Sequence, residues 1–542
     1  MKTNSIDKIS WVLGAVFLGI YFWIIGQNTY NIPRWDDFSV FFQFLCDYLD
    51  CSTFKEKVAL IFDSYGPHHI VFTKLIVLLS YCITGKINIT AFIIIGNLFM
   101  LGIGVMFFAF LRQRKDAGML TLMIVLLLFN GQNFETGTWA MPGLANVGVE
   151  LLTMLSIYFV MKPAKWGFMM GLILSVITIF SNGNGMCLFP AVLFSLLLQK
   201  RKRELLWFAA IAGIAVICYF LTLNWESNSE HGLRIGAIIT GFFYFLGGNM
   251  WFPSFKMIAL LWGLFIFATY VWAIIGGFYR KNIVWFTFLT FMLLTAAMVA
   301  LNRSVEGIAP LRYRIYCCMG TILTVMFYFE NRDALHLTRL FKWFVPPAIL
   351  FSVLCSLLYL GRAEKDSEFK KVSTYNWQRS KSGLHDIFGG GHVVLSQMEA
   401  LQIYTMPKLS LEEIAATVKI TADEWKNGHS HILYHLDFIE DTNDYILIKG
   451  WAYTDEMGMD FTDIFLWLFN GEQSIKVDPY FERRYDVAMD LTVKENCGFF
   501  AVIPKTELRQ GDYKLGIEIQ KRYIVPVKQS SKSIETEIQL QL

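Results

Sequence analysis

The chain has 542 residues, of which 55% are hydrophobic, 16% are aromatic and only 17% are charged. This composition excludes an ordinary soluble globular protein and is typical of a chain that crosses a membrane several times. The formal net charge of +3 is too small to indicate a nucleic-acid-binding protein. The basic residues also lie in short clusters between apolar runs rather than along one face.

Apolar runs of about the length of a bilayer crossing, which takes roughly 20 residues, follow one another up to Gly361. No small-residue cleavage site follows the first run, so we expect a retained anchor rather than a signal peptide. With the basic clusters placed in the cytoplasm, the N-terminus is cytoplasmic and the C-terminal part is extracytoplasmic. Eleven crossings are predicted: 9–26, 88–111, 117–131, 142–161, 166–181, 186–199, 205–223, 256–278, 283–301, 314–329 and 343–361.

Residues 28–87, between the first two crossings, are predicted to form one long outer loop. The stretch "HHIVFTKLIVLLSYCITGKIN" is short of apolar residues for a crossing, contains Lys74, and would force "RQRKD" to the outer face. We therefore expect interfacial amphipathic helices around Phe38 to Asp50 and around Ile70 to Thr84. The run 235–248, "IGAIITGFFYFLGG", is also short, and we interpret it as re-entrant or interfacial.

Polar residues on the predicted outer connections form a candidate site, because titratable groups at membrane depth are costly. In the connection "NRSVEGIAPLRYRIY", cations stand where the positive-inside bias predicts few of them. The candidates are Trp35, Asp36 and Asp37 in "NIPRWDDFSVFF", His68 and His69 in "YGPHH", Glu135 in "NGQNFETGTW", Asn182 and Asn184 in "FSNGNGM", and Arg303, Arg312, Tyr313 and Arg314.

Each candidate also has a structural interpretation. The acid pair could cap a helix in a solvated loop, the histidines could orient the interfacial helix, and the arginines could snorkel to the headgroups. Glu135 could be a solvated loop acid, and "SNGNG" supplies turn chemistry. Glu150, inside an apolar run, could pair within the bundle.

The character of the chain changes after residue 361. Residues 362–428 are polar and predict a helical linker, with an amphipathic helix in "SLEEIAATVKITADEW" opened by a capping box at Ser410. Residues 429–542 show an alternating pattern that predicts a β-sandwich, with Asn470-Gly471 as a hairpin turn. Candidates there for stacking on glycan are Trp451, Trp467, Arg484 and Tyr485, with a place in the core as the alternative for the tryptophans.

Residues 1–361 resemble the GT-C superfamily of integral-membrane glycosyltransferases, which take sugars from polyprenyl-phosphate carriers. The acid pair after the first helix, "YGPHH" before an interfacial helix and the "R…RY" element before a late helix carry the resemblance. Protein O-mannosyltransferases and aminoarabinose transferases of lipid A are similar in layout. Many members have a Lys-Pro-Pro or Glu-His-Arg element where this chain has "YGPHH". The sequence therefore predicts a mainly α fold, a GT-C-like membrane bundle with an extracytoplasmic β-sandwich.

The resemblance implies an inverting transfer of a sugar from a polyprenyl-phosphate donor to a cell-envelope glycan or lipid-linked acceptor, outside the plasma (inner) membrane. Asp36 or Asp37 would take the proton of the acceptor hydroxyl. The arginines, Tyr313 and His68 or His69 would hold the donor phosphate. Trp35, Glu135, Asn182 and Asn184 would contact the acceptor or sugar. A divalent cation, Mg²⁺ or Mn²⁺, fits between an Asp and the phosphate, although no spacing demands one.

Two other classes of function stay open. A polysaccharide or lipid-linked sugar transporter, such as a flippase, would also cross the membrane many times, but internal repeats or broken midplane helices are not evident in the sequence. A non-catalytic envelope assembly protein would use the outer domain as its working part. The long acid-bearing loop argues against a bundle that is only an anchor.

Overall fold

The computed structural model describes the chain apart from residues 1–4, 113, 115–116, 163, 225–233, 253–254, 303–310, 332–340, 382, 385–389, 418–431, 455–463, 472–473, 492–494, 496, 520–522, 527, 532–533, 538 and 542. The chain forms two compact units. Unit 1 comprises Met1–Tyr30 and Ser39–Ala363, and unit 2 comprises Asn31–Phe38 and Glu364–Leu542. A short segment of the predicted outer loop therefore belongs to the same unit as the C-terminal region.

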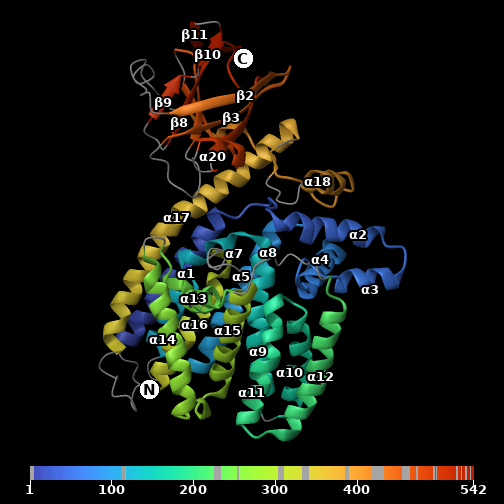
Figure 1. Cartoon of the computed structure of the whole chain (residues 1–542), viewed down its shortest axis with the longest axis vertical. Coiled ribbons are helices and arrows are strands. Elements are labelled where there is room, and N and C mark those ends of the chain that lie inside the picture. The colour runs from blue at the N-terminus through green and yellow to red at the C-terminus, as the bar shows by residue number, and fades with distance from the viewer. Residues whose placement is uncertain are drawn as a thin grey trace. The chain divides into compact units, whose positions relative to one another are not determined.

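Unit 1 is built from helices (Figure 1). Its apolar runs form helices because a helix satisfies its own backbone hydrogen bonds in apolar surroundings. The helices are α1 (Ser5–Gln27), α2 (Phe44–Asp50), α3 (Phe54–Phe62), α4 (Val71–Thr84), α5 (Ile89–Leu111), α6 (Ala117–Leu128), α7 (Phe134–Thr138), α8 (Ala140–Pro142), α9 (Gly148–Met161), α10 (Lys165–Ile179), α11 (Leu188–Leu198), α12 (Lys202–Leu221), α13 (Ile235–Leu246), α14 (Lys256–Ile275), α15 (Ile283–Asn302), α16 (Arg314–Asn331) and the first part of α17 (Phe341–Ser380).

Short 3₁₀ and π-helical turns join several of these helices. They are η1 (Phe38–Gln43), η2 (Gly131–Asn133), η3 (Gly143–Val147), η4 (Gly183–Cys187), η5 (Gly248–Met250), η7 (Phe278–Arg280) and η9 (Leu311–Tyr313). Two of the turns, η1 and η3, are π-helical. Such turns often mark functional positions in helical proteins.

Several helices are long and apolar enough to cross a membrane, so the chain is a multi-pass membrane protein. Among the described residues there are seven, or eight if the bent pair Ala117–Leu128 and Gly131–Thr138 is one span. The seven are Asp7–Gln27, Ile89–Leu111, Ala140–Met161, Lys202–Leu221, Lys256–Ile275, Ile283–Asn302 and Val345–Ser380. The predicted number of eleven is not confirmed. α10, for example, has 15 residues and is about 22 Å long, less than the hydrocarbon core of about 30 Å.

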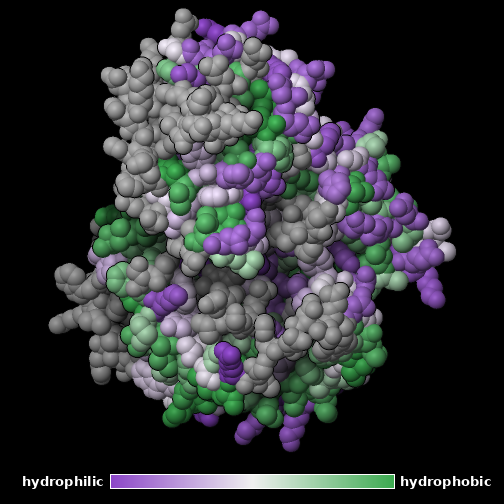
Figure 2. Space-filling view, turned by 45° about the horizontal axis from the view of Figure 1, so that its top comes forward, coloured by the Kyte–Doolittle hydropathy of each residue, from purple (hydrophilic) through white to green (hydrophobic). Residues whose placement is uncertain are grey.

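Large hydrophobic side chains cover much of the surface of unit 1. Trp23 of α1 is 65% exposed and Ile275 of α14 is 80% exposed. Figure 2 shows in green how such residues gather on the helical unit. A contiguous apolar surface of this extent is expected where lipid is the solvent.

The two helices predicted within the outer loop are present. η1 and α2 cover the first, and α4 covers the second, as a 14-residue helix. A third helix, α3, lies between them and was not predicted. It begins with a capping box, in which Thr53 Oγ1 accepts from the Glu56 N–H at 3.2 Å and Glu56 Oε2 accepts from the Thr53 N–H at 3.0 Å.

Unit 2 contains the second part of α17, α18 (Gly391–Ala400), η10 (Leu411–Glu413), α20 (Tyr485–Leu491) and the strands. The strands are β1 (Ala415–Thr417), β2 (Leu433–Asp441), β3 (Tyr445–Tyr453), β4 (Ile464–Phe469), β5 (Ser474–Val477), β6 (Tyr480–Glu482), β7 (Gly498–Pro504), β8 (Asp512–Ile519), β9 (Tyr523–Pro526), β10 (Lys528–Ser531), β11 (Ile534–Glu537) and β12 (Gln539–Gln541).

The strands form antiparallel sheets, and the two larger sheets share one hydrophobic core. One sheet has the order β1-β5-β4-β8-β12 with β9 also on β8, another has the order β2-β3-β7-β6, and β10 pairs with β11. Alternate residues of β3 and β4, such as Ile446, Ile448, Leu466 and Leu468, lie in the same buried cluster. This alternation is what the sequence predicted, since successive side chains of a strand point to opposite faces. Gly471, with φ 94°, lies in the predicted turn between β4 and β5.

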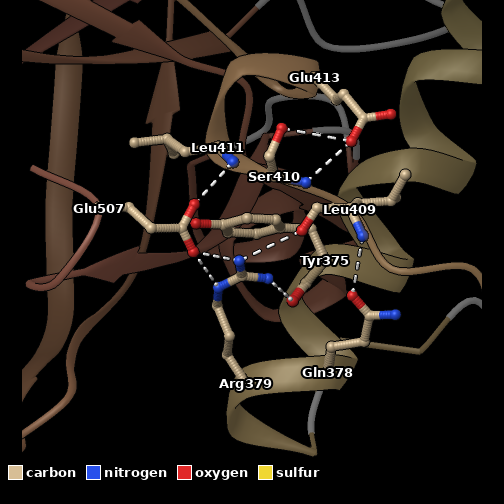
Figure 3. A network of polar contacts seen from close by, with 8 residues as sticks. All are labelled: Tyr375, Gln378, Arg379, Leu409, Ser410, Leu411, Glu413 and Glu507. Atoms are coloured by element: carbon tan, nitrogen blue, oxygen red, sulfur yellow. Dashed lines mark hydrogen bonds and ion pairs between the residues drawn. The ribbon is translucent and has the colours of Figure 1, made fainter.

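An amphipathic helix was predicted to begin after Ser410. For those of its residues that the structure describes, this prediction is wrong. The capping box is present, because Glu413 Oε2 accepts from the Ser410 N–H at 2.8 Å, but it opens only η10 (Figure 3). The chain then enters β1, which pairs with β5. Sheet pairing has overridden local helix propensity there. The rest of the predicted helix, from residue 418, lies outside the described residues.

A polar network ties the end of α17 to the strand-rich part of unit 2 (Figure 3). Arg379 forms an ion pair with Glu507 and lies over the ring of Tyr375 at 3.5 Å. The other carboxylate oxygen of Glu507 accepts from the Leu411 N–H at 2.8 Å. This carboxylate therefore fixes α17 to η10 within the unit.

Candidate functional site

The predicted site residues are distributed over both units. Trp35, Asp36 and Asp37 belong to unit 2. Arg303 lies outside the described residues. The remaining candidates belong to unit 1, and they are His68, His69, Glu135, Asn182, Asn184, Arg312, Tyr313 and Arg314.

Arg314, the first residue of α16, is buried and is held by neutral groups. Its Nη1 donates to Gln132 Oε1 at 3.3 Å and its Nη2 donates to the carbonyl oxygen of Trp251 at 3.2 Å. The guanidinium also lies over the ring of Tyr359 at 4.9 Å. Its Nε has no hydrogen-bond partner among the described residues. A buried cation is therefore present with one donor unused.

Arg312 precedes this helix in η9 and is half-buried. Its guanidinium lies 5.7 Å from the ring centroid of Trp139 and 5.4 Å from that of Tyr313. No carboxylate in the described part of the chain forms an ion pair with Arg312 or Arg314. Two cations in largely apolar surroundings, without a counter-charge from the described residues, favour the binding of an anion.

Two asparagines connect this region to the "SNGNG" turn. Asn182 Nδ2 donates to Asn146 Oδ1 at 2.9 Å and to the Tyr316 hydroxyl at 3.4 Å. Asn146 Nδ2 in turn donates to the backbone carbonyl of Arg312 at 3.1 Å. We name Asn146, Asn182, Arg312, Arg314 and Tyr316 the arginine–asparagine cluster. It combines cations with neutral hydrogen-bonding groups on η3, η9 and α16 and at the N-cap of η4.

The turn that carries Asn182 requires glycine at one position. A Cβ atom at Gly185 would lie 2.0 Å from the carbonyl oxygen of Thr178, which is a severe clash. Asn182 caps the following η4, because its Oδ1 accepts from the Gly183 N–H at 2.7 Å. The "SNGNG" sequence therefore serves as turn chemistry and also presents an amide to the cluster.

The two histidines lie in different surroundings. His68 lies beside the same turn, since a Cβ atom at Gly183 would be 3.3 Å from His68 Cβ. His69 is fully buried, and its Nε2 is 3.1 Å from the Tyr219 carbonyl oxygen and 3.2 Å from Thr222 Oγ1. Its ring packs edge-on against Tyr219. The structure therefore brings both histidines to the segment that carries Asn182: His68 lies beside Gly183, and the ring of His69 lies 5.5 Å from that of Phe180.

The remaining candidates of unit 1 are also buried or half-buried. Asn184 is 4% exposed in η4, and Glu135 is 6% exposed in α7, which packs against η9. Tyr313 is half-buried, and its ring lies 6.2 Å from that of Tyr316. Glu135 is thus buried rather than a solvated loop acid.

Sequence reasoning missed several members of this region. Asn146, Tyr316, Gln132 and Tyr359 come from four separate elements and meet only in the fold. A polar side chain inside an apolar run is a signal that could have singled out Asn146, because such groups are costly in a membrane.

In unit 2, the acid pair lies in a segment that is held by buried charges. Asp37 is 1% exposed, whereas Asp36 is half-buried. Arg34 Nη1 lies 2.7 Å from Asp366 Oδ1, and Lys370 Nζ lies 3.3 Å from Asp366 Oδ2. Asp366 and Lys370 of α17 were not predicted, because the charged run "RAEKDSEFKK" has the pattern of a solvated helix face.

The proposed glycan-stacking residues of unit 2 separate into two kinds. Trp467 is 4% exposed and donates to Glu518 Oε2 at 2.6 Å, so it is a core residue. Trp451 is half-buried and packs 6.3 Å from His435. Tyr485 is 55% exposed. Arg484 is ion-paired with Asp437 and Asp486, and its hydrogen bonds lower the pKa of Asp486 to about 2.

No group of three or more His, Cys, Asp or Glu side chains within the described ranges is placed to hold a metal ion. The predicted divalent cation stays a prediction. Comparison of the chain with known protein families, curated proteins and solved structures finds no match. The arrangement of the residues therefore carries the functional argument by itself.

Proposed function

We propose that the chain is an integral-membrane glycosyltransferase similar to the GT-C superfamily, with a C-terminal β-sandwich module. Its donor is a sugar linked to polyprenyl phosphate, and its acceptor is a cell-envelope glycan or a lipid-linked glycan. The N-terminus lies in the cytoplasm, and transfer occurs on the outer side of the plasma membrane. The observation that carries this proposal is the pair Arg312 and Arg314, two cations without a carboxylate partner among the described residues.

These cations suit the leaving group of the reaction. When the bond between the anomeric carbon and the phosphate oxygen breaks, negative charge grows on the polyprenyl phosphate. The unused Nε of Arg314 and the guanidinium of Arg312 would stabilise that charge. Charges of this kind are effective in surroundings that exclude water, where the dielectric constant is low.

The neutral members of the arginine–asparagine cluster suit the sugar. Asn182 is half-buried and orients its amide with the help of Asn146 and Tyr316. Amide and hydroxyl groups that are already oriented bind sugar hydroxyls with little cost in entropy. A carboxylate of the pair Asp36 and Asp37 would take the proton of the acceptor hydroxyl as its oxygen attacks the anomeric carbon with inversion.

The proposal is tested with the purified full-length protein in lipid and a panel of polyprenyl-phosphate sugars. We expect one donor to yield polyprenyl phosphate and a glycosylated acceptor. The double variant Asp36→Asn, Asp37→Asn should abolish turnover while the protein still folds and still binds polyprenyl phosphate. Its matched control is Asp441→Asn, which removes an exposed carboxylate of unit 2. Unchanged turnover in the double variant would contradict the proposal.

A transporter of lipid-linked sugars is the second candidate, and Glu150 is the observation that favours it. This residue is fully buried in α9, and neither carboxylate oxygen has a hydrogen-bond partner among the described residues. Ionisable groups inside membrane spans often serve proton or ion pathways. If Glu150→Gln abolishes movement of a fluorescent polyprenyl-phosphate sugar across a vesicle bilayer, and no sugar is transferred, the transporter is the correct class.

A further inference from the structure

The segment Asn31–Phe38 is fixed to unit 2 at several points. The Tyr404 hydroxyl donates to the carbonyl oxygen of Asn31. The guanidinium of Arg34 reaches Asp366 of α17, with Nη1 and Oδ1 2.7 Å apart. The segment thus contacts two regions of unit 2 that follow it by more than 300 residues in the chain.

The contact with α17 is a buried cluster of charges. One carboxylate oxygen of Asp366 forms an ion pair with Arg34, and the other forms an ion pair with Lys370. These three side chains are only 3–5% exposed. Asp37 lies near Lys370 and adds a second negative charge. Buried charges are tolerated when groups of opposite charge lie next to them. Removal of Asp366 takes away the carboxylate that Arg34 and Lys370 share.

The two adjacent acids have different surroundings. Asp37 is 1% exposed, and its Oδ2 accepts from the backbone N–H of Arg34 at 3.0 Å, while its own N–H donates to the Arg34 carbonyl at 2.9 Å. Asp37 therefore closes a turn over Trp35. Asp36 is half-buried and keeps part of its surface open. The turn directs one acid inward and leaves the other accessible.

The backbone of the turn is strained, so the surrounding contacts must stabilise its conformation. Trp35 has φ 48°, in the left-handed region that bulky residues rarely adopt. The guanidinium of Arg34 lies 4.2 Å from the Trp35 ring centroid and so fixes the indole from one side. The same guanidinium is held by Asp366. Loss of Asp366 would therefore release both the strained residue and the turn.

We propose that Asp366 and Lys370 are positioning residues for the acidic segment, and that Asp36 is the base while Asp37 closes the turn. This inference rests on the proposed function. In the reaction, Asp36 takes the proton of the acceptor hydroxyl as the hydroxyl oxygen forms its bond to the anomeric carbon. The bond from that carbon to the phosphate oxygen breaks, and the polyprenyl phosphate leaves with the electron pair.

The first test does not depend on sugar transfer. Hydrogen exchange of residues 31–38 is measured in the full-length protein for the wild type, Asp366→Asn, Asp366→Glu and Asp441→Asn. We expect at least about tenfold faster exchange of this segment in Asp366→Asn, because opening of the turn becomes easier. Asp366→Glu keeps the charge and should restore most of the protection. Unchanged exchange in Asp366→Asn overturns the positioning role.

The second test separates the acids by turnover. Asp36→Asn should lower kcat by about 1,000-fold or more with the exchange of residues 31–38 unchanged. Asp37→Asn and Asp366→Asn should speed exchange and lower kcat by about 100-fold, with KM for the donor within about twofold, because the base is misplaced. Full activity in Asp36→Asn overturns its assignment as the base. If the wild type transfers no sugar at all, the proposed function fails, and the exchange data still decide the positioning role.

Discussion

The two units differ in how they hold buried cations. Among the described residues four cationic side chains are buried: Arg34, Lys74, Arg314 and Lys370. In unit 2, Arg34 and Lys370 share the carboxylate of Asp366. In unit 1, the two cations are held by neutral oxygens instead. A buried cation that is paired with a carboxylate supports structure. Arg314, which is held by neutral acceptors, is instead suited to bind an anionic ligand.

The largest effect should follow from removal of Arg314 together with Arg312, the half-buried cation that precedes it and also lacks an ion pair with the described carboxylates. We expect the double variant Arg312→Gln, Arg314→Gln to weaken binding of polyprenyl phosphate by about 1,000-fold, since two charge-assisted contacts are lost. Binding is measured by native mass spectrometry in detergent, with polyprenol as the uncharged control ligand. If the wild type binds polyprenol and polyprenyl phosphate equally well, the cations of unit 1 do not bind the phosphate. The proposed difference between the cations of the two units would then be wrong.

Removal of a paired cation of unit 2 should act on stability instead. Lys370→Met leaves Asp366 with one cation in a buried cluster, so we expect the free energy of unfolding to fall by about 3 kcal/mol. Thermal and denaturant unfolding of the purified protein measure the change. The matched control is Lys505→Met, whose partner Asp441 is 57% exposed, and it should cost less than about 1 kcal/mol.

Lys74 in unit 1 should make stability depend on pH. Its Nζ donates to the carbonyl oxygens of Leu60 and Asp63, both at 2.8 Å, and burial lowers its pKa to about 8. Between about pH 8 and 10.5 the unfolded chain then binds more protons than the folded one, so stability rises with pH. We expect a gain of about 2 kcal/mol from pH 7.5 to 9.5.

This dependence is measured by unfolding at the two pH values. Lys74→Met should abolish the gain, because it removes the titrating amine. A gain of the same size in the variant would show that another group is responsible.

The smallest effect concerns the capping box of α3, which is local to one short helix. Thr53→Ala should lower the stability of α3 by about 1 kcal/mol, because the Glu56 N–H loses its acceptor. Hydrogen exchange of residues 54–62 reports the change. Thr53→Ser, which keeps the hydroxyl, should exchange like the wild type.

The sequence predicted the elements whose signal is local. The crossing predicted at 88–111 is α5, and the one predicted at 283–301 is α15, because a long uninterrupted apolar run favours only a membrane helix. The alternation in β3 and β4 was equally clear. Shorter runs such as 166–181 were ambiguous, since an apolar helix buried among others has the same composition as a crossing.

The candidate site was less predictable, because its neighbours come from distant parts of the chain. Arg314 was singled out by an unexpected charge, but its contacts Gln132 and Tyr359 depend on the packing of η2, α16 and α17. Asp366 lies in a charged run whose burial no periodicity could show. A sequence pattern shows that a residue is polar or charged. Which group pairs with that residue depends on the tertiary structure.

The membership of Asn31–Phe38 in unit 2 has a consequence for biosynthesis. The ribosome completes this segment when most of unit 2 is still untranslated, so Arg34 and Asp37 emerge before Asp366 and Lys370 exist. Since chain growth proceeds at about 5–20 residues per second, the wait lasts roughly 20–60 s. During that time the acidic segment lacks the groups that shape it, and the nascent protein acquires its ordered turn only after residue 370 has been translated.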